Sequence, residues 1–173
     1  MAQVVQPSDE QLRACCAADT WLRTMTSARP FPSVDAALAL SDEVVLGLDA
    51  AGVDEALAAH ARIGERRSGS STEDRWSRTE QAGALAVDTD VQTRLAEANR
   101  RYEQRFGRVF LIRAAGRSAQ EMLAALEERL HHDDDTELDV VRRELADIVR
   151  LRLEKVVSTG STTRDGSTAR GPA

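Results

Sequence analysis

The sequence predicts an all-α fold, in which a single domain is built as a bundle of several helices. Apolar residues recur at intervals of three and four along most of the chain, and no segment shows the alternation that is typical of a strand. The protein has 173 residues, which is enough for one domain with a real core but too few for two. It contains two Trp, one Tyr and three Phe, so Leu, Val and Ala must form most of the core, and Leu and Ala favour helices.

Short helices are predicted in the first third of the chain. The apolar spacing places them at 8–17, 19–26, 33–39, 42–48 and 51–59. The sequence Arg29-Pro30-Phe31-Pro32 separates the second from the third, because proline does not fit a helix interior. A loop rich in Gly and Ser follows at 64–71, and a further helix at 71–86 begins where the hydroxyl of Ser71 can cap it.

Longer helices are predicted in the second half. A helix at 88–106 carries one apolar stripe and ends at Gly107. Its stripe consists of Val91, Leu95, Ala98, Tyr102 and Phe106. The apolar run 109–112 is short enough to be an extended, buried connection, and the helix at 118–130 begins with a serine and a glutamate spaced as a capping box.

The last predicted helix, at 135–157, closes the domain. The sixteen residues that follow, 158–173, are mainly Ser, Thr, Gly and Arg, and they offer almost no apolar surface to bury. We therefore expect a helical domain over 1–157 and a disordered tail over 158–173.

Composition excludes several classes of partner. A net charge of −6 argues against nucleic acid, because phosphate binding requires clustered positive charge. No apolar stretch approaches the length of a membrane span, and the first residues lack the basic and apolar regions of a signal peptide. Cys15 and Cys16 are adjacent, so they are poor disulfide partners and indicate a reducing compartment. A cytoplasmic location is expected.

The final helix places an arginine on its apolar stripe. The stripe runs through Leu138, Val141, Leu145 and Ile148, and the next position on it is Arg152. Two interpretations remain open at this point. The guanidinium of Arg152 meets a carboxylate or an anionic ligand inside the protein, or its stem packs while the charged end reaches water.

Two further groups could carry chemistry. Ser77, Glu80 and Gln81 share one face of the predicted 71–86 helix, where they form either a binding surface for a polar heterocycle or a solvated face. His60 ends an apolar helical run; its side chain suits proton transfer near neutral pH, although a single histidine is often structural. The stretch 131–135, which contains two histidines and three aspartates, lacks a metal-ligand spacing and is predicted to be a solvated loop.

Read together, these segments resemble the family of 2-oxo-4-hydroxy-4-carboxy-5-ureidoimidazoline (OHCU) decarboxylases. The similarity follows the family's order and covers nearly the whole predicted domain. The residues that carry it are Trp21, Arg29-Pro30-Phe31, His60-Ala61-Arg62-Ile63-Gly64, Ser77, Glu80-Gln81, Asn99, Tyr102, Phe106-Gly107, Phe110, Gly116, Ser118, Arg129-Leu130, Glu137, Glu144, Ile148 and Arg152-Leu153.

The resemblance implies an all-α enzyme of urate breakdown, often a homodimer, that converts OHCU to (S)-allantoin and carbon dioxide without a cofactor or metal. It implies that His60 and Glu80 are catalytic and that Ser77, Gln81 and Arg152 bind the substrate. One departure is Ala61, because the family commonly has proline after the histidine. The alternatives are an inactive homologue and a non-enzymatic helical interaction domain, whose corresponding side chains would be dispersed over the surface.

Overall fold

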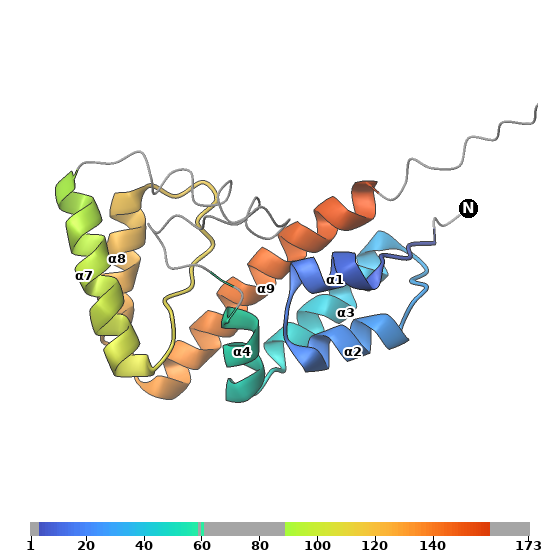
Figure 1. Cartoon of the computed structure of the whole chain (residues 1–173), viewed down its shortest axis with the longest axis horizontal. Helices are drawn as coiled ribbons and strands as arrows, with labels where there is room; N and C mark the ends of the chain where they lie inside the picture. Colours follow the sequence, from blue (N-terminus) through green and yellow to red (C-terminus); the bar gives the residue numbers. More distant parts are fainter. Residues whose placement is uncertain (1–3, 59, 61–88, 160–173) are drawn as a thin grey trace, which may run out of the picture.

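The computed structural model describes residues 4–58, 60 and 89–159, and these residues form an all-helical structure (Figure 1). Its helices are α1 (Asp9–Cys15), α2 (Asp19–Ser27), α3 (Val34–Leu46), α4 (Ala50–Leu57), α7 (Thr89–Phe106), α8 (Ala119–Arg129) and α9 (Asp134–Thr159). Within the described residues the only β pairing is an isolated bridge between Val5 and Phe31. The predicted fold class is therefore confirmed, whereas the predicted helix at 71–86 lies outside the described residues.

Local sequence signals set most of the helix starts. The Ser8 hydroxyl accepts a hydrogen bond from the backbone N–H of Gln11, whose side chain accepts one from the backbone N–H of Ser8, and Ser118 and Glu121 form a similar pair. Both pairs are capping boxes, which satisfy backbone N–H groups that a helix start leaves without partners. The capping box predicted for the helix at 118–130 is therefore confirmed.

Helix α3 corrects one prediction, because the helices expected at 33–39 and 42–48 are a single helix. In the structure Ser41 is fully buried inside the helix, and its hydroxyl accepts a hydrogen bond of 3.0 Å from the indole N–H of Trp21. A tertiary contact with α2 thus satisfies the polar side chain at the point where the sequence analysis separated the two helices.

The described helices form two apolar clusters. The first cluster packs α1, α2, α3 and α4 against α9, and the second packs α7 against α8. Figure 1 shows α7 and α8 side by side at one end of the molecule, with the long helix α9 running from that end to α1 and α3 at the other. Helix α9 is therefore the element that connects the two parts, and none of the described helices is both long and apolar enough to cross a bilayer.

The connection between α7 and α8 contacts both clusters. Gly107 has a φ of 70°, a left-handed conformation that glycine adopts readily, and it ends α7 as predicted. The side chains of Phe110 and Ile112 lie in the second cluster, whereas that of Leu111 lies in the first. These three residues are buried without forming a strand, so the predicted burial of the apolar run is confirmed.

Candidate functional site

His60 lies immediately after α4. Its backbone N–H donates a 2.9 Å hydrogen bond to the carbonyl of Leu57, which adds a turn beyond the end of the helix, and its side chain is partly exposed. The apolar face of α4, which includes Val53 and Leu57, is buried in the first cluster with α9. The start of α4 is also held, because Arg142 of α9 donates a 2.7 Å hydrogen bond to the carbonyl of Leu48. His60 is thus positioned by a short helix that packs on α9.

Arg152 is buried in α9, with only 3% of its surface exposed. It continues the buried stripe of Leu145 and Ile148, so the predicted inward orientation is confirmed and the alternative, in which the charged end reaches water, is excluded. Its charge acts on the thiol of Cys16, which follows α1. Burial raises the pKa of Cys16 to about 11, and the nearby Arg152 lowers it by a smaller amount.

The remaining predicted site residues, Ser77, Glu80 and Gln81, lie outside the described residues. The described structure therefore accounts for two of the five predicted site residues. It brings the helix that ends at His60 and the helix that carries Arg152 into one buried cluster, through Leu57 of α4 and Leu153 of α9.

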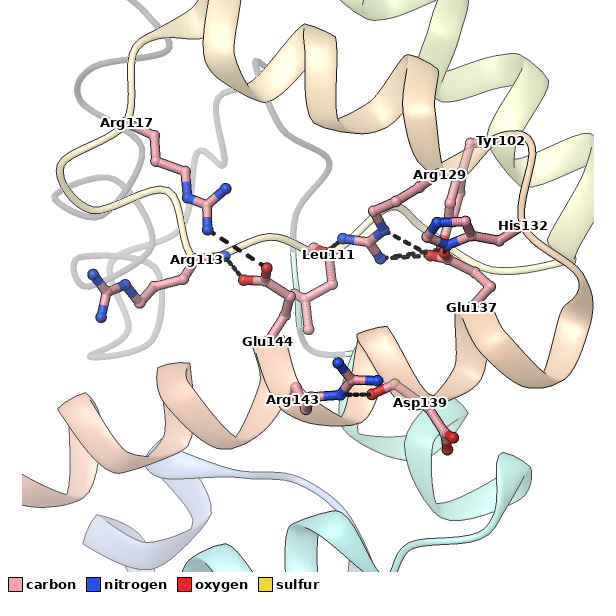
Figure 2. Close-up of polar contacts among 10 residues, drawn as sticks. All are labelled: Tyr102, Leu111, Arg113, Arg117, Arg129, His132, Glu137, Asp139, Arg143 and Glu144. Carbon is pink, nitrogen blue, oxygen red and sulfur yellow. Dashed lines mark hydrogen bonds and ion pairs between the residues drawn. The ribbon is translucent and has the colours of Figure 1, made fainter.

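A buried polar network that the sequence analysis missed connects α7, α8 and α9 (Figure 2). Arg129 at the end of α8 donates to Oε1 of Glu137 from Nε at 2.9 Å and from Nη2 at 2.5 Å. The hydroxyl of Tyr102 donates to the same oxygen, and Nδ1 of His132 lies 2.8 Å from the other carboxylate oxygen. Arg129 also donates a 2.8 Å hydrogen bond to the carbonyl of Leu111.

The network is compensated in charge and shielded from water. The side chains of Arg129 and Glu137 are 6% and 1% exposed, so each charge depends on the other rather than on solvent. Burial raises the pKa of Tyr102, the Arg129 charge opposes this, and the hydrogen bond to Glu137 adds to the increase. The phenol therefore stays neutral and acts as a hydrogen-bond donor.

The prediction of a solvated loop at 131–135 largely holds, because these residues are exposed except for His132, which is partly buried and contacts Glu137. The stretch is not a loop to its end, since α9 begins at Asp134. Periodicity offered a signal for the buried network: Glu137 lies one turn before Val141 on the buried side of α9. Among the described residues no group of three His, Cys, Asp or Glu side chains is arranged to hold a metal ion.

A second carboxylate of α9 holds the connection between α7 and α8. Oε2 of Glu144 accepts a 2.7 Å hydrogen bond from the backbone N–H of Arg113, and Oε1 lies 3.7 Å from Nη2 of Arg117. Figure 2 shows the side chain of Arg113 pointing away from this carboxylate. Glu144 thus binds the backbone of the connection and not the guanidinium of Arg113.

An open groove of about 570 Å³ lies elsewhere, between α2 and α3. Its lining consists of Thr20, Arg23, Thr24, Ser27, Ala28 and Leu40. None of these is a predicted site residue, and the charge of Arg23 is already paired with Asp19 at 3.0 Å. We therefore do not assign the groove to the chemistry.

Comparisons with known proteins agree with the resemblance read from the sequence. Residues 6–154 match the sequence model of the OHCU decarboxylase family. The chain is 32% identical over 153 residues to the uric acid degradation bifunctional protein TTL of Arabidopsis thaliana, a match that covers 87% of this chain and 47% of that protein. It is 30% identical over 139 residues to the 2-oxo-4-hydroxy-4-carboxy-5-ureidoimidazoline decarboxylase of Amia calva, with 79% of each chain covered. The chain thus spans about half the length of the bifunctional plant protein.

Solved structures show the same similarity. A crystal structure of an OHCU decarboxylase in the presence of (S)-allantoin superimposes with a TM-score of 0.74 at 27% identity, covering 87% of this chain and 99% of that one. A crystal structure of an (S)-allantoin synthase superimposes with a TM-score of 0.64 at 16% identity and supports the fold alone.

Proposed function

The chain belongs to the OHCU decarboxylase family, and we propose that it converts OHCU to (S)-allantoin and carbon dioxide in the breakdown of urate. The observation that carries the proposal is the family match over residues 6–154, which includes His60 and Arg152 as well as the residues between them. The similarity to an OHCU decarboxylase crystallised in the presence of (S)-allantoin supports the same substrate class.

The decarboxylation of OHCU does not require the protein to supply an electron acceptor. When the carboxylate leaves as carbon dioxide, the electron pair of the broken C–C bond must move to an acceptor. Many enzymes supply that acceptor with a lysine Schiff base or an organic cofactor. OHCU contains a ring C=N beside the carbon that bears the carboxylate, so the substrate can accept the electron pair itself. The only lysine of the chain, Lys155, is exposed, which makes it a poor candidate for a Schiff base.

Under this proposal the protein orients the substrate and moves protons, and no cofactor or metal takes part. His60 and Glu80 lie near the 4-hydroxyl and the carboxylate of OHCU, where they transfer protons and turn the carboxylate out of the ring plane. The negative charge of Glu80 beside the substrate carboxylate is repulsive, and the loss of carbon dioxide relieves it. Protonation of the product from one face then gives the S configuration.

Three residues bind the substrate in this proposal. Ser77 and Gln81 form hydrogen bonds with its ring and ureido groups, and Arg152 binds a ring or ureido oxygen. The burial of Arg152, at 3% exposed, supports its role. A guanidinium away from water interacts with an anionic or carbonyl ligand more strongly than it would at the surface, since bulk water screens charge.

A direct test follows product chirality. OHCU is generated in situ from urate with the upstream enzymes, and allantoin is monitored by circular dichroism with and without this protein. We expect an excess of (S)-allantoin only when the protein is present. The same weak signal in both reactions would favour an inactive homologue and overturn the proposed function.

We further propose that the protein acts as a homodimer in the cytoplasm. The homodimer is inferred from the family, and the cytoplasmic location is supported by the two buried cysteines, which form no disulfide. Light scattering coupled to size exclusion should give twice the 18.9 kDa mass of one chain. A mass of one chain over the working concentration range would reject the dimer.

A further inference from the structure

The connection between α7 and α8 contributes side chains to both apolar clusters. Leu111 shares its buried cluster with Leu57, three residues before His60, and with Leu153, the neighbour of Arg152. Phe110 and Ile112 bury their side chains in the other cluster. The segment 110–113 therefore lies at the boundary between the second cluster, formed by α7 and α8, and the first cluster, which supports the two described site residues.

The backbone of this segment is held by side chains instead of by a neighbouring strand. Arg129 donates to the carbonyl of Leu111 at 2.8 Å, and Glu144 accepts from the N–H of Arg113 at 2.7 Å. A buried backbone without secondary structure needs such partners, because unpaired polar groups are costly away from water. The two bonds act on opposite sides of Ile112, so together they fix both the position and the direction of the chain.

Glu144 lies beside the apolar stripe of α9 that carries the buried arginine. Glu144, Ile148 and Arg152 are four residues apart, so they follow one another on one side of the helix. A rise of 1.5 Å per residue separates Glu144 from Arg152 by about 12 Å along the axis. The carboxylate that holds the segment is thus on the same rigid element, and on the same side of it, as the proposed substrate ligand.

We propose that Glu144 is a positioning residue for the decarboxylation: it holds the backbone of segment 110–113 in place as a wall of the substrate site beside Arg152. This inference rests on the proposed function. The contact has the form expected of a positioning role, because Glu144 binds the backbone N–H of Arg113 and leaves the side chain of that residue pointing away (Figure 2). The side chain of Glu144 is only 16% exposed, so the hydrogen bond is partly shielded from water.

The test compares Glu144→Ala with Glu144→Gln and with a control on the same helix. Glutamine keeps an oxygen that can accept from the Arg113 N–H, whereas alanine removes it. Asp139→Ala is the control, because Asp139 is a 60% exposed carboxylate of α9 that pairs with Arg142 and has no hydrogen bond to the segment. All proteins are assayed for kcat and KM with OHCU well below their melting temperatures, and exchange of the Arg113 amide hydrogen is measured in parallel.

We expect Glu144→Ala to raise KM about tenfold, with kcat changed less than about threefold, because the loss of binding that the substrate and the transition state share raises KM and leaves kcat unchanged. The Arg113 amide should exchange faster in this variant. Glu144→Gln should restore most of the loss in KM, and Asp139→Ala should match the wild type. If Glu144→Ala does not fold, Glu144→Asp, which retracts the carboxylate by one methylene, should show the rise in KM instead.

Several outcomes would overturn the proposal. One is a folded Glu144→Ala protein with wild-type KM, which would make the residue purely structural. Another is a Glu144→Gln protein as impaired as the alanine variant, which would assign the effect to charge. A wild-type protein that produces no excess of (S)-allantoin would reject the proposed function itself, whereas normal wild-type turnover with unchanged variants would reject only the positioning role.

Discussion

Replacing Arg129 with methionine should be one of the most destabilising single substitutions in this protein. Methionine has a similar length and can fill the space, but it leaves the Glu137 carboxylate buried at 1% exposure without its guanidinium partner. The carbonyl of Leu111 also loses its 2.8 Å hydrogen bond. Breaking a buried pair from one side typically costs about 3–5 kcal/mol. For a chain of this size that corresponds to a fall in melting temperature of roughly 6–20 °C.

Urea unfolding followed by circular dichroism measures this cost, and an exposed pair supplies the control. Arg94 and Glu127 join α7 to α8 at 3.1 Å, but their side chains are 53% and 46% exposed. Arg94→Met removes the same kind of charge from an exposed pair that also involves α8, and it should cost no more than about 1 kcal/mol because surface pairs contribute little. The contrast between the two variants isolates the effect of burial.

The double variant Arg129→Met with Glu137→Leu tests whether the two buried charges compensate each other. Removing both charges should recover part of the stability, leaving about 1 kcal/mol for each of two groups that lose a partner, the Tyr102 hydroxyl and the Leu111 carbonyl. The two substitutions should therefore be strongly non-additive. If Arg129→Met unfolds within about 1 kcal/mol of the wild type, or if the two changes simply add, then the network is not the compensated buried pair described above.

Three other predictions concern the proposed site and the thiols. Arg152→Lys should fold normally but lose at least ~10-fold in kcat/KM, about 1.4 kcal/mol, because lysine keeps the charge without the planar donor geometry; wild-type turnover would remove Arg152 from the site. His60→Ala and Glu80→Ala should each lose at least ~100-fold in rate while remaining folded, and near-normal turnover would exclude the residue concerned. Cys15 and Cys16 are buried, so a thiol reagent at about pH 8 should react with them only in unfolded protein, and rapid labelling of native protein would contradict this. Because burial raises the folded pKa of Cys16 from 9.0 to about 11, its contribution to stability is complete below pH 9.0 and is lost as the pH rises toward 11, an effect that Cys16→Ala should remove.

Local patterns were sufficient for the parts of the fold that local interactions determine. Helix α7 was predicted at 88–106 and observed at Thr89–Phe106, because its apolar stripe and the glycine that ends it are both short-range signals. The start of α8 was predicted for the same reason, since its capping box spans only three residues. Periodicity also placed Arg152 on the apolar stripe of α9, although it left open whether the charged end is buried or reaches water, and the structure shows that it is buried.

Partners that are distant in sequence account for what the patterns missed. Ser41 is part of a continuous helix because Trp21, twenty residues away, donates to its hydroxyl. The Glu137 carboxylate is part of a buried network because Tyr102, 35 residues earlier, donates to it. Neither interaction has a fixed spacing, so no local rule for caps or loops could have identified it.

The charged residues on the buried side of α9 show that periodicity identifies buried positions without revealing what each charge binds. Periodicity places Glu137, Glu144 and Arg152 on that side, but it does not distinguish a structural charge from one that binds a substrate. In the structure Glu137 pairs with Arg129, eight residues earlier, and Glu144 accepts a hydrogen bond from the backbone of Arg113, 31 residues away. Both carboxylates thus hold protein groups: Glu144 binds the connection between α7 and α8 directly, whereas Glu137 binds Arg129, which in turn donates to the carbonyl of Leu111. Substitutions at Glu137 should therefore mainly lower stability, and those at Arg152 should mainly lower turnover. Substitutions at Glu144, which lies between them on the helix, should raise KM with little loss of stability.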